Sequence, residues 1–232
     1  MKTLRKSILM LFVGTTMFSM TSCKSFKKLT KQEKGILIGA AGGAAAGGAI
    51  GSKSKNPAVY AIIGSAVGGV AGAVIGKYMD KQADELNKKL GSVAQVERIE
   101  EGIKVTMSSG ILFGFDSHKL SETSKDNLSK LATILKDYKE TNIVINGYTD
   151  NVGSDRYNKN LSVKRAKEVS DYMGQMGIDS KRFTVVGYGA EFPVADNETE
   201  QNRLKNRRVE LAIVANDNLK NDAAKAGAST KK

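Results

Sequence analysis

Glycine recurs every fourth residue in two uncharged segments near the start of the chain, at Gly39, Gly43, Gly47 and Gly51 and at Gly64, Gly68, Gly72 and Gly76. In a helix this spacing aligns each set along one ridge, where a second backbone can approach closely. The polar stretch 52–57 separates the segments, so the sequence predicts a helical hairpin over residues 35–77. Glycine costs about 1 kcal/mol relative to alanine in a soluble helix, which favours lipid or a homo-oligomer as the surroundings. The spacing leaves open whether the hairpin spans a membrane.

Before the glycines, three basic residues precede an uncharged, mostly apolar run over residues 8–20, which ends in Met20-Thr21-Ser22-Cys23. This arrangement is typical of a signal peptide, and its end resembles a bacterial lipobox. We therefore expect residues 1–22 to be a lipoprotein signal peptide, Cys23 to be lipidated, and residues 23–34 to form a basic linker. The alternative is an ordinary secretory signal with an incidental free cysteine. Because no aspartate follows Cys23, the resemblance implies an outer-membrane address with the C-terminal domain in the periplasm. The glycine segments likewise resemble the glycine-zipper domains of bacterial envelope lipoproteins.

Residues 78–94 are charged and predict a helical connector, and residues 95–214 predict one folded domain. Alternating apolar residues predict a hairpin over 93–107, turning at Glu101-Gly102, and further strands at 111–115, 142–148, 183–186 and 208–214. Apolar residues at helical spacing predict helices from Ser121 to about Tyr138 and over 155–176. The order β-α-β-α-β-β indicates an α+β fold, a two-layer sandwich with helices on one face of the sheet. Residues 215–232 lack periodicity and are predicted to be disordered.

The helix predicted over 155–176 carries an unexpected charge on its inward face. Extending its apolar stripe toward the N-terminus places Asn158, Leu161, Ser162 and Arg165 on that face. A buried arginine needs a partner or a polar recess, because an unpaired buried charge is costly. Asp150, in the loop that enters the helix, is a candidate partner or co-ligand. Spacing alone would favour a plain structural ion pair.

Four motifs in order then resemble the OmpA-like peptidoglycan-binding domain: LFGFDSHKL (112–120), GYTDNVGSDRYNKNLSVKRA (147–166), FTVVGYGAEFP (183–193) and NRRVEL (206–211). The resemblance covers residues 95–214. It implies that Asp150 and Arg165 clamp the free amino-acid end of diaminopimelate in the peptide stem. It also implies that Phe115, Asp116, Thr149, Asn158 and Leu161 line that pocket. For Arg207 and Arg208, which match the NRR motif, ion pairing beneath the site and ligand contact are both open.

Composition restricts the alternatives. One cysteine and one histidine in 232 residues exclude a disulfide framework and a Cys/His metal cluster. A Ser-His-Asp triad would depend on His118, which no acid–nucleophile pattern surrounds, so we expect no enzyme, no cofactor and no metal. The formal net charge of +12 suggests nucleic-acid binding, but no basic–aromatic pattern accompanies it.

The sequence therefore predicts a non-enzymatic tether whose partners are the outer membrane and peptidoglycan. A second class of function is a membrane-permeabilising or assembly component, in which the glycine hairpin oligomerises and the wall domain only positions it. A stator-type channel subunit is disfavoured, because both apolar segments lack an acidic residue.

Overall fold

The computed structural model of the chain describes residues 69–113 and 117–229. The predicted signal peptide, Cys23, the basic linker and the glycine hairpin up to residue 68 lie outside these ranges. Phe115 and Asp116 also lie outside them. No helix within the two described ranges is long and apolar enough to cross a membrane.

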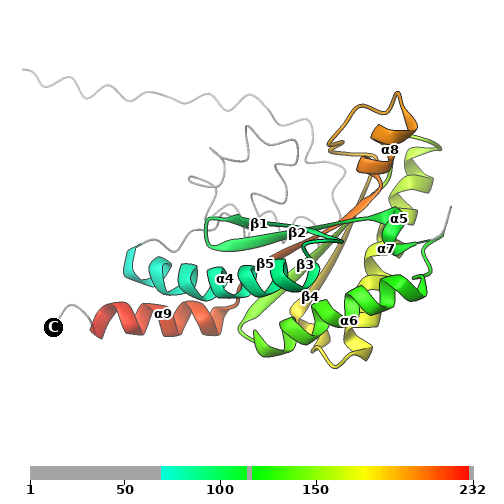
Figure 1. Ribbon diagram of the computed structural model, residues 1–232. Helices are drawn as coiled ribbons and strands as arrows, with labels where there is room; N and C mark the ends of the chain where they lie inside the picture. The colour runs from blue at the N-terminus through cyan, green and yellow to red at the C-terminus, as the bar shows by residue number, and fades with distance from the viewer. Residues whose placement is uncertain (1–68, 114–116, 230–232) are drawn as a thin grey trace, which may run out of the picture.

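One mixed sheet of five strands organises the described residues, in the order β1-β2-β5-β3-β4 (Figure 1). β3 and β4 are parallel, and the other neighbouring strands are antiparallel. The strands are β1 (Gln95–Ile99), β2 (Gly102–Ser108), β3 (Thr141–Tyr148), β4 (Phe183–Gly189) and β5 (Arg208–Ala215). Parallel β3 and β4 require a crossover, and the helix between them supplies it.

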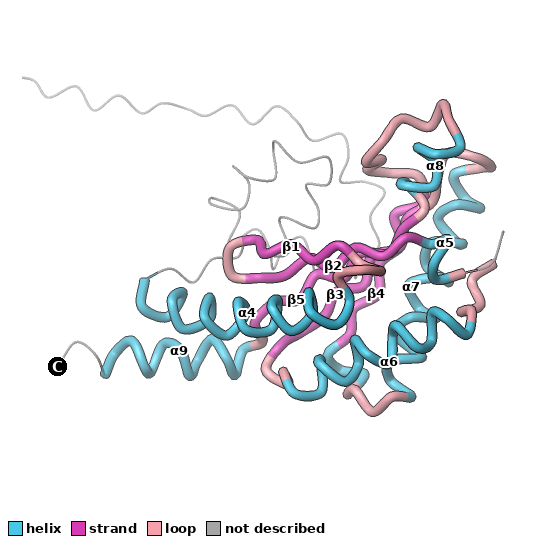
Figure 2. The backbone as a smooth tube through the Cα atoms, viewed as in Figure 1, coloured by secondary structure: helices cyan, strands magenta, loops and turns pink. Residues whose placement is uncertain are grey.

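Helices α4, α6 and α7 cover one face of this sheet (Figure 2). They bury one continuous core against it, which includes Leu86, Leu131 and Val169 from the helices and Ile145 and Leu211 from the strands. A smaller cluster with Tyr148 and Tyr188 lies on the other face. The helices are α4 (Gly69–Leu90), α5 (Ser109–Leu112), α6 (Glu122–Asp137), α7 (Asp155–Gln175), α8 (Glu200–Asn206) and α9 (Asp217–Ser229), and a 3₁₀ turn spans Ser180–Arg182. The predicted α+β fold class, with helices on one face, is confirmed.

The helix boundaries follow the expected capping chemistry. The Ser121 hydroxyl accepts from the amide of Ser124 at 3.2 Å and so begins α6. Leu128, Leu131, Leu135 and Tyr138 are buried, as their spacing predicted. α7 ends at Gln175, and Gly177 follows at φ +91°, a conformation that favours glycine.

The strand predicted over residues 111–115 is wrong over residues 111–113, and residues 114 and 115 lie outside the described ranges. Ser109–Leu112 forms the single turn α5, and Phe113 makes only an isolated bridge to Leu120. The buried Ser124 hydroxyl donates to the carbonyl of Leu112 at 2.6 Å. This bond from α6 satisfies a carbonyl that a strand neighbour would otherwise have to satisfy, so the turn is stable where a strand was expected.

The disordered tail predicted from residue 215 is also wrong over residues 217–229, which form α9. Asn216 caps this helix, since its side-chain oxygen accepts from the amide of Leu219 at 3.0 Å. Leu219 and Ala223 are buried, and Gly227 approaches Val70 of α4 closely. α9 therefore packs along α4 (Figure 1).

Two ridge glycines, Gly72 and Gly76, lie in the described part of α4, which begins at Gly69 and continues into the predicted connector (78–94) as far as Leu90. Among the described residues, both glycines have neighbours in the β1–β2 hairpin. A Cβ on Gly72 would lie 2.5 Å from a carboxylate oxygen of Glu101, and the carbonyl of Gly76 accepts from Arg98 at 3.4 Å. The end of the second glycine ridge thus packs on the β1–β2 turn.

Candidate functional site

The site is built where α7 lies unusually close to the ends of β3 and β4. A Cβ on Gly147 of β3 would lie 2.1 Å from the carbonyl oxygen of Ser162, and one on Gly187 of β4 would lie 2.5 Å from the amide nitrogen of Val163. The Ser162 hydroxyl also accepts from the amide of Gly189 at 2.9 Å. Glycine at both strand positions allows this approach, which fixes α7 against the strand ends.

The loop that leaves β3 orients Asp150. The Thr149 amide donates to the carbonyl of Gly189 at 2.8 Å, and the Thr149 hydroxyl donates to the carbonyl of Asp150 at 2.9 Å. The Asp150 Oδ1 accepts from the amide of Val152 at 3.1 Å, a local turn that aspartate favours. Thr149 and Asp150 are both buried. The carboxylate is therefore held in one orientation at the end of the strand.

The first turn of α7 locks the other side of the same loop. Gly153 adopts φ +96°, and the Ser154 hydroxyl caps the helix by accepting from the amide of Tyr157 at 3.2 Å. The Asn158 side chain donates to the carbonyl of Val152 at 3.0 Å. Asn158 is buried and Leu161 is half-buried. Of the pocket residues that the resemblance implies, Asp150, Thr149 and Asn158 thus share one hydrogen-bonded loop.

Arg165 lies on the buried face of α7, as the helical spacing predicted. Its exposed fraction is 4%, and Asn158 and Ser162 lie on the same face. Its Nε donates to the carbonyl of Ser117 at 3.0 Å, and its guanidinium carbon lies 5.3 Å from the centroid of the Phe113 ring. Phe113 and Ser117 therefore both contact Arg165, Phe113 through a cation–π contact.

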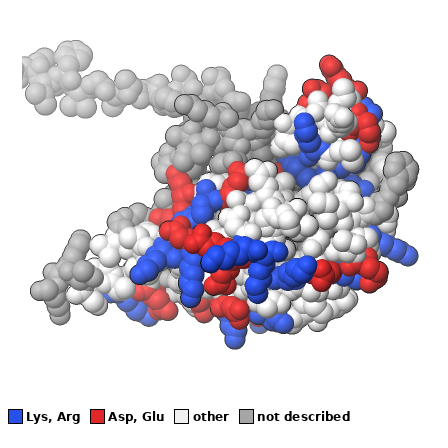
Figure 3. Space-filling view, viewed as in Figure 1, with Lys and Arg blue, Asp and Glu red and all other residues white. Residues whose placement is uncertain are grey.

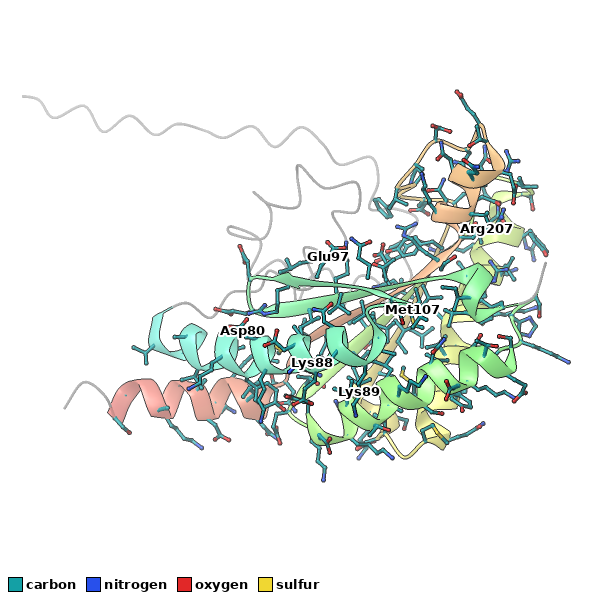
Figure 4. The ribbon with its side chains drawn as sticks, in the orientation of Figure 1. Asp80, Lys88, Lys89, Glu97, Met107 and Arg207 are labelled. Atoms are coloured by element: carbon teal, nitrogen blue, oxygen red, sulfur yellow. The ribbon has the colours of Figure 1, made fainter. Side chains whose placement is uncertain are left out.

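The ion pair that Asp150 makes is with Arg207. The Arg207 Nη1 donates to the Asp150 Oδ2 at 2.5 Å, from the point where α8 passes into β5 (Figure 4). A second Arg207 nitrogen pairs with the carboxylate of Glu200, which also accepts from Arg203 at 3.0 Å. Burial lowers the pKa of Arg207, but the bonds to Glu200 and Asp150 outweigh this effect and raise it. The bonds from Arg207 and then Arg203 hold the pKa of Glu200 below its ordinary value.

Arg208 is the first residue of β5 and takes a different role from Arg207, which lies just before the strand. It is buried, its Nε donates to Glu210 at 2.7 Å, and its guanidinium carbon lies 3.7 Å from the centroid of the Tyr148 ring. The sequence left ion pairing and ligand contact open for both arginines of the NRR motif, and the structure gives the two arginines different positions. Arg207 reaches the site, and Arg208 braces the strand end beneath it.

The loop before α8 is tied to the Asp150 loop through two asparagines. Buried Asn206 accepts from the amides of Val194 and Ala195 at 2.9 and 3.0 Å, and its amide nitrogen donates to the Asn197 Oδ1 at 2.9 Å. The same Asn197 oxygen accepts from the amide of Asn151 at 3.3 Å. Sequence reasoning missed α8, Glu200 and this network. The available signal was Thr199 before an acidic residue, a helix-start pattern that the structure realises.

This arrangement supplies one buried carboxylate and two guanidinium groups from separate elements. Such a set suits a ligand group that carries both an ammonium and a carboxylate, because each charge then meets its opposite. Among the residues that the structure describes, no group of three His, Cys, Asp or Glu side chains is placed to hold a metal ion. Phe115 and Asp116 cannot be placed in the site, since they fall in the gap between the described ranges.

Comparison with known proteins gives two family matches. The model of the OmpA family matches residues 112–207, and that of the YMGG-like Gly-zipper matches residues 1–80. The outer-membrane lipoprotein YfiB of Pseudomonas aeruginosa is 36% identical over 116 residues, which are 50% of this chain and 69% of that protein. The peptidoglycan-binding protein ArfA of Mycobacterium tuberculosis is 37% identical over 115 residues, 50% of this chain and 35% of ArfA.

Solved structures agree with the fold. A MotB-like protein from Desulfovibrio vulgaris superposes with a TM-score of 0.58 at 25% identity, and the match covers 62% of this chain and 95% of that one. Several curated relatives are much longer, and the chain spans about a third of their length. Because the match to YfiB covers more than two thirds of that lipoprotein and the family model covers the site residues Asp150, Arg165 and Arg207, the chain belongs to the OmpA family.

Proposed function

We propose that this protein binds peptidoglycan non-covalently through the Asp150 site and tethers the outer membrane to the cell wall. The observation that carries the proposal is a buried, oriented Asp150 carboxylate at the end of β3, together with a buried Arg165 on α7, the helix that the Asp150 loop enters. The name of the relative ArfA, a peptidoglycan-binding protein, supports the same ligand.

The proposed ligand group is the free amino-acid end of diaminopimelate in the peptide stem. Its ammonium would donate to Asp150, and its carboxylate would accept from the Arg165 guanidinium, whose fork matches a carboxylate. Asp150 already accepts from Arg207. A carboxylate has about four lone-pair directions, so it can accept from an ammonium as well. The Glu200 carboxylate meanwhile balances the charge of Arg207.

The remaining predicted residues have distinct proposed roles. The side chains of Thr149 and Asn158 donate hydrogen bonds to carbonyls of the Asp150 loop, so we assign both residues to positioning Asp150. Half-buried Leu161 supplies an apolar wall for the ligand's methylene chain. Phe115 and Asp116 are proposed as pocket residues because Ser117, directly after them, contacts Arg165.

The anchor is proposed at the other end of the chain. Acylation of Cys23, after removal of residues 1–22, would supply several acyl chains, and two chains already suffice for stable attachment. The name of the relative YfiB, an outer-membrane lipoprotein, supports this location. The hairpin over 35–77 would then lie in or at the membrane, with or without a second copy, and the domain over 95–214 would face the wall from the periplasm.

Two measurements on the full-length protein test the two halves of this function. Purified sacculi should sediment the wild-type protein from detergent solution, and soluble diaminopimelate-containing stem peptide should release it. Cys23→Ala should leave the protein unprocessed or soluble while sacculus binding persists. If the wild-type protein does not sediment with sacculi, the proposed peptidoglycan binding is wrong. If Cys23→Ala still floats with outer membranes, lipidation is not the anchor.

A further inference from the structure

The solvent-facing side of α4 changes from apolar to basic at Lys77. Val70 and Val74 are 43% and 38% exposed. Lys77, Lys81 and Lys88 follow and are exposed as well. These spacings of four, three, four and seven residues place all five side chains on one stripe of the helix. The opposite stripe, with Ile75, Met79, Ala83, Leu86 and Leu90, is buried in the core. The exposed stripe is therefore accessible to a partner.

This stripe begins at the end of the molecule farthest from α8. Figure 1 shows α4 and α9 side by side, with the start of α4 and the end of α9 together at that end. Gly227 of α9 contacts Val70 there. The 22 residues of α4 extend about 33 Å at 1.5 Å per residue, so the exposed stripe runs along a large part of the molecule.

The lysines of the stripe lack acidic partners among the described residues. Asp80, one residue before Lys81, is engaged by Arg98 at 2.7 Å. Asp84 is the one acidic residue on the stripe itself. Figure 3 shows the resulting row of basic side chains along α4, and Figure 4 shows Lys88 on its outer side. A positive, unpaired row beside exposed valines fits an anionic surface with an apolar interior.

We propose that Val70 and Val74 enter the headgroup region of a phospholipid membrane, and that Lys77, Lys81 and Lys88 contact its anionic phosphates. The chain order agrees with this placement, because no charged residue occurs between Lys55 and Lys77. α4 would then lie along the membrane surface, and the burial of its opposite stripe in the core would fix the orientation of the wall-binding domain relative to that surface. This inference rests on the membrane anchoring proposed above.

A second copy of the chain fits the same stripe poorly. Copies anchored in one membrane run parallel, so a contact through this stripe would bring Lys77, Lys81 and Lys88 against the same lysines. Like charges at close range are destabilising, whereas lipid phosphates neutralise them. Charge complementarity therefore favours lipid as the occupant of the stripe.

The chain contains no tryptophan, so a single introduced tryptophan reports its own surroundings. Val74→Trp places the reporter on the stripe, and Leu204→Trp places it at a side chain of similar exposure, 41%, on α8 at the far end. The full-length lipidated protein is reconstituted on vesicles of phosphatidylethanolamine and phosphatidylglycerol. Emission spectra and quenching by brominated lipids are recorded, with thermal melting to confirm that both variants fold.

The proposal predicts blue-shifted emission for Val74→Trp and quenching by brominated lipid several-fold stronger than for Leu204→Trp. Adding Lys77→Glu and Lys81→Glu should reverse both effects. A protein that floats with the vesicles while both tryptophans remain in water overturns this inference and leaves the anchor intact. A blue shift that depends on protein density but not on brominated lipid overturns it in favour of self-association. A protein that does not float overturns the anchoring as well. Sacculus binding of Val74→Trp should stay at the wild-type level, so wall binding is tested separately.

Discussion

Arg207 donates to the Oδ2 of Asp150 at 2.5 Å, across 57 positions of sequence. The carboxylate proposed to hold the ligand's ammonium is thus already oriented by a cation of the same domain. The second contact of Arg207, to Glu200, keeps the guanidinium in place from the other side. Ligand binding at Asp150 then requires no movement of an arginine, only the sharing of a carboxylate.

Removing Arg207 should therefore weaken ligand binding although Arg207 is not proposed to touch the ligand. Arg207→Met leaves the Asp150 carboxylate without its ion pair, and we expect a loss of about 1–3 kcal/mol in the free energy of unfolding. Affinity for the stem peptide should fall roughly tenfold, since 1.4 kcal/mol corresponds to a factor of ten. Arg203→Met is the matched control, because Arg203 pairs with Glu200 and has no ion pair with Asp150. Equal affinities for the two variants, measured by titration calorimetry, would contradict this role.

The Glu200 pair should respond to acid in a defined direction. Bonds from Arg207 and Arg203 hold the pKa of Glu200 in the folded protein below its ordinary value. The pairing therefore stabilises α8 fully at a pH above the ordinary pKa of glutamate. This stabilisation is lost as the pH falls through the lowered pKa of the folded protein. Hydrogen exchange of the α8 amides should be slower in wild type than in Glu200→Gln at neutral pH. The difference should vanish well below pH ~4. A difference that grows on acidification would show that the sign is wrong.

The close approach of α7 to β3 should make Gly147 intolerant of any side chain. Gly147→Ala puts a Cβ against the Ser162 carbonyl, and overpacking of this kind costs about 1–3 kcal/mol. Gly174 lies in α7, and a Cβ added there meets nothing within 4 Å. Gly174→Ala should therefore stabilise the protein by up to about 1 kcal/mol through helix propensity. Urea denaturation of both variants tests the pair. A stable Gly147→Ala would mean that α7 does not lie where the site needs it.

The same substitution at two adjacent alanines of α9 should have very different effects on stability. Ala223 is fully buried against the core, whereas Ala224 is exposed. Ala223→Asp buries an unpaired charge and should lower the free energy of unfolding by several kcal/mol. Ala224→Asp should change it by less than about 0.5 kcal/mol. Similar melting temperatures for the two variants would indicate that residues 217–229 do not pack on α4.

The sequence predicted those parts of the molecule in which one local signal decides the structure. α7 and the inward Arg165 follow from apolar periodicity interrupted by a charge, and Ser121 follows from capping chemistry. α9 escaped prediction because its inward stripe is Leu219, Ala223 and Gly227, and alanine and glycine add little to a hydrophobic pattern. Its burial depends on α4, more than 120 residues earlier in the chain.

The ion-pair partner of Asp150 could not be predicted from local sequence for a similar reason. The sequence offered Arg165, fifteen residues away along the chain, and the structure gives Arg207 as the ion-pair partner. β5 lies between β2 and β3, and this sheet order returns Arg207 to the end of β3. α8 has only seven residues and no apolar stripe, so Thr199 before an acidic residue was its one local signal, and that signal does not indicate that Glu200 pairs with Arg207.

The central claim is that Asp150 and Arg165 bind one zwitterionic group of peptidoglycan, and paired measurements on three variants test it most directly. Sacculus binding and melting temperature are measured for Asp150→Ala, Arg165→Ala and the double variant. Each charge-assisted contact contributes about 1.5–3 kcal/mol, so each single variant should bind about ten- to a hundred-fold more weakly. The double variant should be little worse, because both contacts serve one ligand group. A folded single variant that binds diaminopimelate-type sacculi at wild-type strength would contradict the account.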